Sequence, residues 1–143
     1  MIDSDIRNMS ALQRRTLLHK GMLAIHADPL GKGGSRVGSC RTGSKAEPTH
    51  DIQYMRNARG SVGGCQVWVK PLAGNESAVA LLNLDDTPTK LTVSFGLLGY
   101  PATASLGVAD VWAEGAKSVH RGGFTTPELV AAHGTTVLRV SHG

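Results

Sequence analysis

The stretch SDIRNMSALQRRTLLHKGMLAIHADPLGKGG, Ser4–Gly34, contains the only clear helical periodicity in this sequence of 143 residues. Its apolar residues recur at steps of three and four positions: Leu12, Leu17, Leu18, Met22 and Ile25. This spacing is typical of a helix with one apolar face. No second helical segment follows along the chain, so that face needs another kind of partner surface.

The ends of this helix are marked by residues that commonly begin and end helices. Ser10 and Gln13 have the spacing of a capping box. Asp28 precedes a proline, which disfavours helical backbone, so the helix should end there. Gly21 lies inside the pattern and lowers helix propensity by about 1 kcal/mol relative to alanine. It is a candidate point of division between a main helix and a short second turn.

Residues 35–64 are rich in glycine and contain few large apolar side chains. We expect a long surface loop there, with at most one brief strand around Ile52, Tyr54 and Met55. From Cys65 onward the sequence is rich in β-branched and apolar residues, and Pro71 is expected to end the first ladder. Strands are expected in these ranges: 66–72, 77–84, 90–95, 104–112 and 134–140, with a further hairpin around 122–124. Short strands at this spacing predict an antiparallel β-sandwich.

Composition excludes two broad classes. The formal net charge is only +4, and Arg14-Arg15 is the only adjacent basic pair, whereas nucleic-acid binders cluster their basic residues. No segment approaches the roughly 18–20 apolar residues that a membrane helix needs. We therefore expect neither nucleic acid nor a membrane as a partner.

The sequence shows no metal or cofactor motif. Its six histidines lack metal-ligand spacing, and neither a phosphate-binding nor a dinucleotide-binding glycine motif occurs. The two cysteines, Cys40 and Cys65, allow two readings. They are either free thiols or one disulfide that closes the glycine-rich loop and stabilises the fold by roughly 3 kcal/mol.

A glycosidase active site requires two opposed carboxylates, so every acidic residue is a candidate. The eleven are Asp3, Asp5, Asp28, Glu47, Asp51, Glu76, Asp85, Asp86, Asp110, Glu114 and Glu128. Asp85 and Asp86 lie in a predicted turn, where aspartate is common for backbone reasons, and Asp28 ends a helix. Asp3 and Asp5 would follow whatever strand precedes the helix. The residues alone therefore indicate no active site.

Several blocks, in this order, resemble glycoside hydrolase family 27, the α-galactosidases. They are Ser4–Ser10, Ile25–Lys32, Val67–Leu72, Ala78–Asn83, Val108–Trp112 and Ala132–Leu138. The DPLGK and VWVKPL blocks are the most specific. His26-Ala27 departs from the family's Asn-Gln before Asp-Pro, and the loop after Ser35 is longer than is usual in the family.

The resemblance implies an α+β piece of a larger enzyme. Residues 1–34 would be the end of a (β/α)8 barrel, with its last helix; 35–64 a glycine-rich loop insertion; and 65–143 the C-terminal antiparallel β-sandwich. The family hydrolyses terminal α-linked galactose with retention, without a cofactor, and its two catalytic aspartates lie on earlier barrel strands. Neither motif occurs here, so we assign no catalytic, substrate-binding or metal-binding residue. The chain alone is expected to be inactive.

The resemblance also implies partners and a location. The partners would be the missing catalytic barrel, an α-galactoside for the intact parent, and a second copy in a homodimer of that parent. The family is usually secreted, lysosomal or vacuolar. Asn75 and Asn8 both begin N-glycosylation sequons, and Asn75 lies in a predicted surface turn.

An alternative function is a non-catalytic carbohydrate-binding or interaction module. Trp68, Trp112 and Tyr100 could provide stacking faces, although tryptophans on predicted strands more often belong to the core. If the chain folds alone, the apolar helix residues should be partly exposed or folded onto the sandwich. These residues are Leu12, Leu18, Met22 and Ile25.

Overall fold

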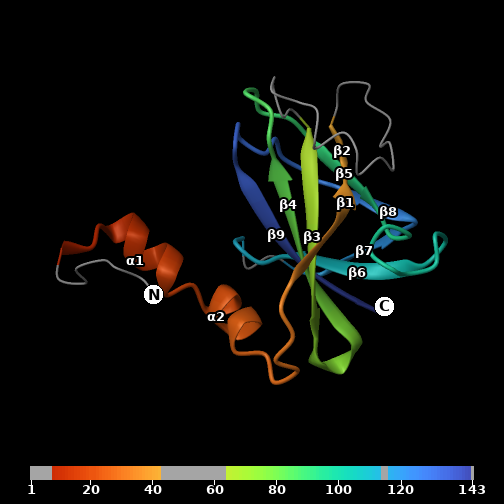
Figure 1. The fold of residues 1–143 in the computed structure, drawn as a ribbon, viewed down its shortest axis with the longest axis horizontal. Helices are drawn as coiled ribbons and strands as arrows, with labels where there is room; N and C mark the ends of the chain where they lie inside the picture. Colours follow the sequence, from red (N-terminus) through yellow and green to blue (C-terminus); the bar gives the residue numbers. More distant parts are fainter. Residues whose placement is uncertain (1–7, 43–63, 114–115, 143) are drawn as a thin grey trace.

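A computed structural model of the protein describes residues 8–42, 64–113 and 116–142 (Figure 1). Two short helices precede two antiparallel sheets. The larger sheet has the strand order β1-β3-β4-β9-β6-β7, and the smaller has the order β2-β5-β8. The antiparallel β-sandwich predicted from the sequence is confirmed.

The helices are α1 (Ala11–Leu17) and α2 (Lys20–His26). The six-stranded sheet contains β1 (Ser35–Ser39), β3 (Cys65–Leu72), β4 (Glu76–Asn83), β9 (Thr135–His142), β6 (Ser105–Asp110) and β7 (Ser118–Arg121). The three-stranded sheet contains β2 (Arg41–Thr42), β5 (Leu91–Ser94) and β8 (Gly123–Thr125). A short 3-10 turn, η2 (Ala73–Asn75), joins β3 to β4.

The main core lies between the two sheets. Strands β3, β4 and β9 each turn alternate side chains inward, as the period of two in a strand requires. In the register of β3 and β4, Val67 stands opposite Leu81 and Val69 opposite Val79. The smaller sheet and the loop after it supply inward residues from the other side: Leu91, Val93, Phe95 and Phe124. The two inner faces thus bury each other's apolar side chains.

All six strand regions expected after Cys65 are present in the structure. Pro71 does not end its ladder, because it pairs with Ser77 of β4. On the other side of β3, however, pairing with β1 reaches only Val69. Pro71 therefore lies where β3 is locally an edge strand, and a missing N–H is tolerated there.

The range expected to be a loop contains two strands that the sequence did not predict. β1 pairs with β3, and β2 pairs with β5, so the chain crosses between the sheets near Cys40. The register of β1 shifts between Arg36 and Gly38. A Cβ atom at Gly38 would lie 2.8 Å from Leu97 Cδ1, so this strand needs glycine to pack closely. The expected strand around Ile52, Tyr54 and Met55 lies outside the described residues.

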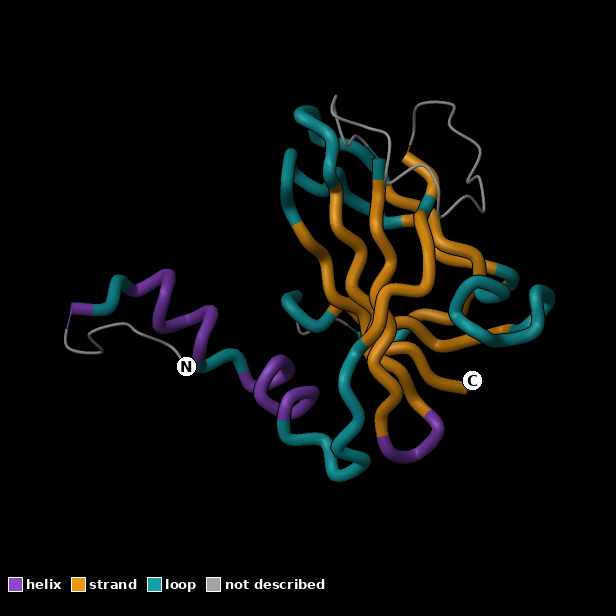
Figure 2. Tube along the Cα trace, viewed as in Figure 1, coloured by secondary structure: helices purple, strands orange, loops and turns teal. Residues whose placement is uncertain are grey.

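The single helix expected from the periodicity is two helices of seven residues each (Figure 2). The capping box is confirmed: Gln13 N donates to Ser10 Oγ, and Ser10 N donates to Gln13 Oε1. The division lies at Leu18 and His19 rather than at Gly21, which is inside α2. The helices separate there because α2 lies against the sheet, whereas α1 extends away from it (Figure 1).

Cys40 and Cys65 form a disulfide, so this reading of the two cysteines is confirmed. Their Cα atoms are 5.1 Å apart, and both residues are buried in the main core. The bond joins the point where the chain crosses between the sheets to the first residue of β3. Among the described residues, neither helix has the length and apolar character of a membrane span.

Candidate docking surface

Helix α2 covers part of the outer face of the six-stranded sheet. A second apolar cluster forms there from Ile25, Leu72, Ala78, Val111 and Val137. Met22, Ala80 and Trp112 pack against it. Ala78 and Ala80 alternate with the inward residues of β4, so this cluster is separate from the main core. Small side chains on the strand leave room for the helix.

Gly21 and His19 set how closely α2 approaches this face. A Cβ atom at Gly21 would lie 2.7 Å from Val111 Cγ1, closer than packed side chains normally come. The His19 ring meets the Trp112 ring edge-on at a centroid distance of 5.0 Å, a favourable aromatic geometry. The His19 Nδ1 atom is buried and has no hydrogen-bond partner among the described residues.

Asp28 fixes the segment that leaves α2. Its carboxylate accepts hydrogen bonds from Leu30 N at 3.0 Å and from Ala73 N at 3.0 Å. The Lys70 Nζ atom donates to Lys32 O at 2.6 Å. The DPLGK motif is thus tied to the β3–β4 hairpin, and the structural role predicted for Asp28 is confirmed.

In contrast to α2, α1 buries none of its residues. The exposed fractions are 71% at Leu12 and 62% at Leu18, next to an exposed Leu23 on α2. The expectation for this apolar stripe is confirmed: Ile25 and Met22 fold onto the sandwich, and Leu12 and Leu18 are exposed. We call α1 together with the outer sheet face beside α2 the docking surface.

Trp68 belongs to the outer face and is 39% exposed, so the expectation that it is a core residue is wrong. The reason is strand alternation: Val67 and Val69 point inward, which turns Trp68 outward. Its indole Nε1 donates to Gln66 Oε1 at 3.2 Å. Trp112 packs beneath α2, and the Tyr100 hydroxyl is 3.0 Å from Ser77 Oγ.

The described carboxylates hold structural positions. Besides Asp28, Glu76 pairs with Arg139, and Asp110 accepts from Trp112 N and Ala113 N. Asp85 accepts from Gly64 N, Asp86 lies 3.1 Å from His133 Nε2, and Glu128 is exposed. The other five candidates lie outside the described residues: Asp3, Asp5, Glu47, Asp51 and Glu114. Within the described part of the chain, no group of three His, Cys, Asp or Glu residues could hold a metal ion.

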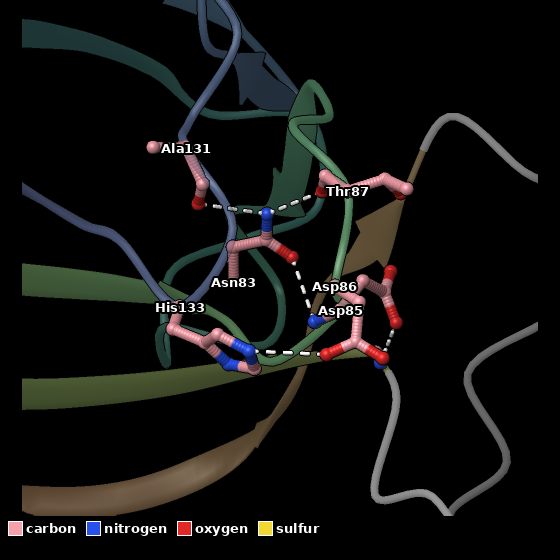
Figure 3. Close-up of polar contacts among 7 residues, drawn as sticks. Asn83, Asp85, Asp86, Thr87, Ala131 and His133 are labelled. Atoms are coloured by element: carbon pink, nitrogen blue, oxygen red, sulfur yellow. Dashed lines mark hydrogen bonds and ion pairs between the residues drawn. The ribbon is translucent and has the colours of Figure 1, made fainter.

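Asn83 is the central polar residue of the turns at the end of the sheet (Figure 3). Its Nδ2 atom donates to Thr87 O at 2.9 Å, Val130 O at 3.1 Å and Ala131 O at 2.9 Å. Its Oδ1 atom accepts from Asp85 N at 3.0 Å. Sequence reasoning placed Asn83 at the end of a strand block but gave it no role.

Comparison with known proteins identifies the family. Residues 62–140 match the alpha galactosidase C-terminal beta sandwich domain family, Melibiase_C. This chain belongs to that family. The match covers more than half of the chain and agrees with the two-sheet architecture, so the resemblance to the C-terminal part of family 27 α-galactosidases is confirmed.

Curated relatives of this Melibiase_C chain are α-galactosidases. It is 32% identical over 112 residues to alpha-galactosidase 3 of Arabidopsis thaliana, covering 78% of this chain and 21% of that protein. It is 24% identical over 141 residues to a probable alpha-galactosidase of Dictyostelium discoideum, covering 99% and 30% respectively. The chain thus spans less than a third of the length of each.

Solved structures show the same fold. The Mortierella vinacea alpha-galactosidase I structure superposes with a TM-score of 0.73 at 19% identity, covering 98% of this chain and 31% of that one. A family 27 β-L-arabinopyranosidase from Geobacillus stearothermophilus gives a TM-score of 0.67 at 16% identity, covering 96% and 25%. At this identity the likeness establishes the Melibiase_C fold and not the substrate.

Proposed function

We propose that the chain is the C-terminal part of an α-galactosidase-type glycoside hydrolase, which removes terminal α-linked galactose with retention. Its Melibiase_C match and its α-galactosidase relatives support this proposal. The substrate of the intact enzyme would be an α-galactoside. In this proposal residues 1–34 end a catalytic barrel, 35–64 form an insertion, and 65–143 form the sandwich.

The role proposed for the chain itself is structural: α1 and α2 complete the barrel, and the sandwich packs beside it. The observation that carries this role is the exposure of Leu12 and Leu18 on a helix that buries nothing. Burying two leucines would stabilise an interface by a few kcal/mol. The adjoining α2 and its Asp28 anchor already fix one side of the joint to the sandwich.

Catalysis is proposed to require residues beyond this chain. A retaining glycosidase needs two carboxyl groups roughly 5 Å apart across the substrate. Asp28, Asp85 and Asp110 instead bond to backbone N–H groups, and Glu76 bonds to Arg139. A strand end from one side of a barrel cannot supply two such opposed groups.

The first test is turnover of an aryl α-galactoside by the purified 143-residue chain. We expect no release of the aryl leaving group above a boiled-protein control. Turnover that a galactose-like inhibitor abolishes would overturn the structural role. The second test is the genomic sequence upstream of Met1. A reading frame that encodes a barrel would support the proposal, and a stop codon shortly before Met1 would contradict it.

Three further parts of the proposal concern the intact parent. It would be a homodimer, and it would be secreted, lysosomal or vacuolar, as is usual in the family. The Cys40–Cys65 disulfide supports such a location, because disulfides persist mainly in oxidising compartments. Sedimentation of the intact parent would test the dimer.

The exposure of Trp68 supports a second candidate, a carbohydrate-binding module. Its ring lies on an outer sheet face and is held by Gln66, and an aromatic face of this kind can stack on a sugar. Titration with galactosides, followed by tryptophan fluorescence, tests this function. A saturable change that Trp68→Ala removes and Tyr100→Phe retains would favour binding, whereas no saturable change would exclude this role for Trp68.

A further inference from the structure

Asn75 lies at the tip of the β3–β4 hairpin, in the sequon Asn75-Glu76-Ser77. The residue is exposed and has a left-handed backbone, with φ of 63°. Asparagine tolerates this conformation better than most residues do. The hairpin projects beyond the end of the six-stranded sheet (Figure 1).

The space around this tip is open. A Cβ atom built at the neighbouring Gly74 would have no atom within 4 Å. Within the described part of the chain, no hydrogen bond holds the Asn75 side chain. The base of the hairpin is fixed nevertheless, because Asp28 binds Ala73 N and Arg139 binds Glu76. A large group on Asn75 would therefore project into solvent from a well-held turn.

The other sequon, Asn8-Met9-Ser10, has a different setting. Its Ser10 hydroxyl caps α1, and Asn8 lies directly before that helix. A glycan at Asn8 would stand beside the docking surface and interfere with a partner there. Asn75 lies instead on the hairpin that follows β3, at the end of that strand opposite Cys65.

The disulfide provides an independent observation. Cys40 and Cys65 are bonded, and structural disulfides form in the same oxidising secretory compartments in which N-glycans are added.

We propose that Asn75 is an N-glycan acceptor. The donor is a lipid-linked pyrophosphate oligosaccharide, supplied with its transferase by the secretory pathway. A bond forms between sugar C1 and Asn75 Nδ2 while the sugar–phosphate bond breaks. The lipid pyrophosphate leaves, and the amide loses one proton.

The test is expression of the full chain behind a cleavable signal peptide in a eukaryotic host. Whole-cell extract and medium are both examined, with and without a glycan-removing amidase. We expect one glycan on the wild type, seen as a mobility shift that the amidase removes. Because glycan transfer precedes folding, retained or misfolded protein also reports the result.

Three variants locate the site. Asn75→Asp, which keeps a turn-forming side chain, should abolish the shift. Ser77→Thr and Asn8→Gln should each keep it. Wild type without a shift, or a shift that persists in Asn75→Asp, would overturn the proposal. The result is independent of the proposed hydrolase role, because it requires no barrel and no turnover.

Discussion

At the scale of single residues, two buried or half-buried polar side chains hold the connections between elements. Asp28 was predictable as a structural residue, because an aspartate before a proline at a helix end commonly bonds to nearby backbone N–H groups. Its bond to Ala73, 45 positions away, was not predictable from local pattern. Asn83 was missed for the same reason, since Val130 and Ala131 lie 47 and 48 positions further along.

Replacing Asn83 should destabilise the sandwich strongly. The residue is only 1% exposed, and its amide serves three carbonyl oxygens. Asn83→Ala should lower the free energy of unfolding by about 3 kcal/mol, since buried acceptors lose their donor. Asn83→Asp should cost more, because a carboxylate would face those carbonyls. Urea unfolding measures both, and exposed Asp86→Asn, expected within about 0.5 kcal/mol of wild type, is the control.

Removing the Asp28 carboxylate should loosen the helical segment without unfolding the main core. Asp28→Ala leaves the Ala73 and Leu30 N–H groups without their acceptor and should cost about 1–2 kcal/mol. Asp28→Asn keeps an acceptor oxygen and should cost less. Thermal unfolding orders the variants. An equal loss for both would show that charge, rather than hydrogen-bond acceptance, matters at this position.

At the scale of elements, the strands of the sandwich were predictable because their alternation is strong. β4 and β9 each carry inward valines and leucines at a period of two. The same alternation around Val67 and Val69 indicated that Trp68 faces outward, although tryptophan usually suggests a core position. β1 has only Val37 as a large apolar residue, and that residue is exposed, so backbone pairing with β3 defines this strand. No side-chain pattern could have revealed it.

The two helices should contribute unequally to stability. Ile25→Ala opens a cavity in the cluster under α2 and should cost about 2 kcal/mol. Removal of residues 1–18 should change the free energy of unfolding by less than about 0.5 kcal/mol, because α1 buries no side chain. Urea unfolding measures both. Leu23→Ala, an exposed change on α2, is the matched control, and a large loss on truncation would contradict the assignment of α1 as unpartnered.

At the scale of the whole molecule, the chain crosses between sheets at the position of its disulfide. β1 ends at Ser39 in the larger sheet, and β2 begins at Arg41 in the smaller one. Cys40 lies between them, and its N–H donates to Cys65 O at 3.3 Å. The sequence alone left free thiols and a disulfide open, because 25 positions of glycine-rich chain separate the cysteines. Packing of two sheets on one core brings them together.

The disulfide should therefore be worth several kcal/mol to the sandwich. Its loop spans 25 positions, for which the loss of unfolded-chain entropy predicts about 3.5 kcal/mol. Two measurements separate this entropy from packing. Reduction of the wild type keeps both sulfur atoms, whereas Cys40→Ala with Cys65→Ala also empties part of the core. If cross-linking dominates, both should lower the urea midpoint, with the double variant lower by the smaller packing loss. A reduced protein as stable as the oxidised one would mean that the packed sheets alone fix this crossing.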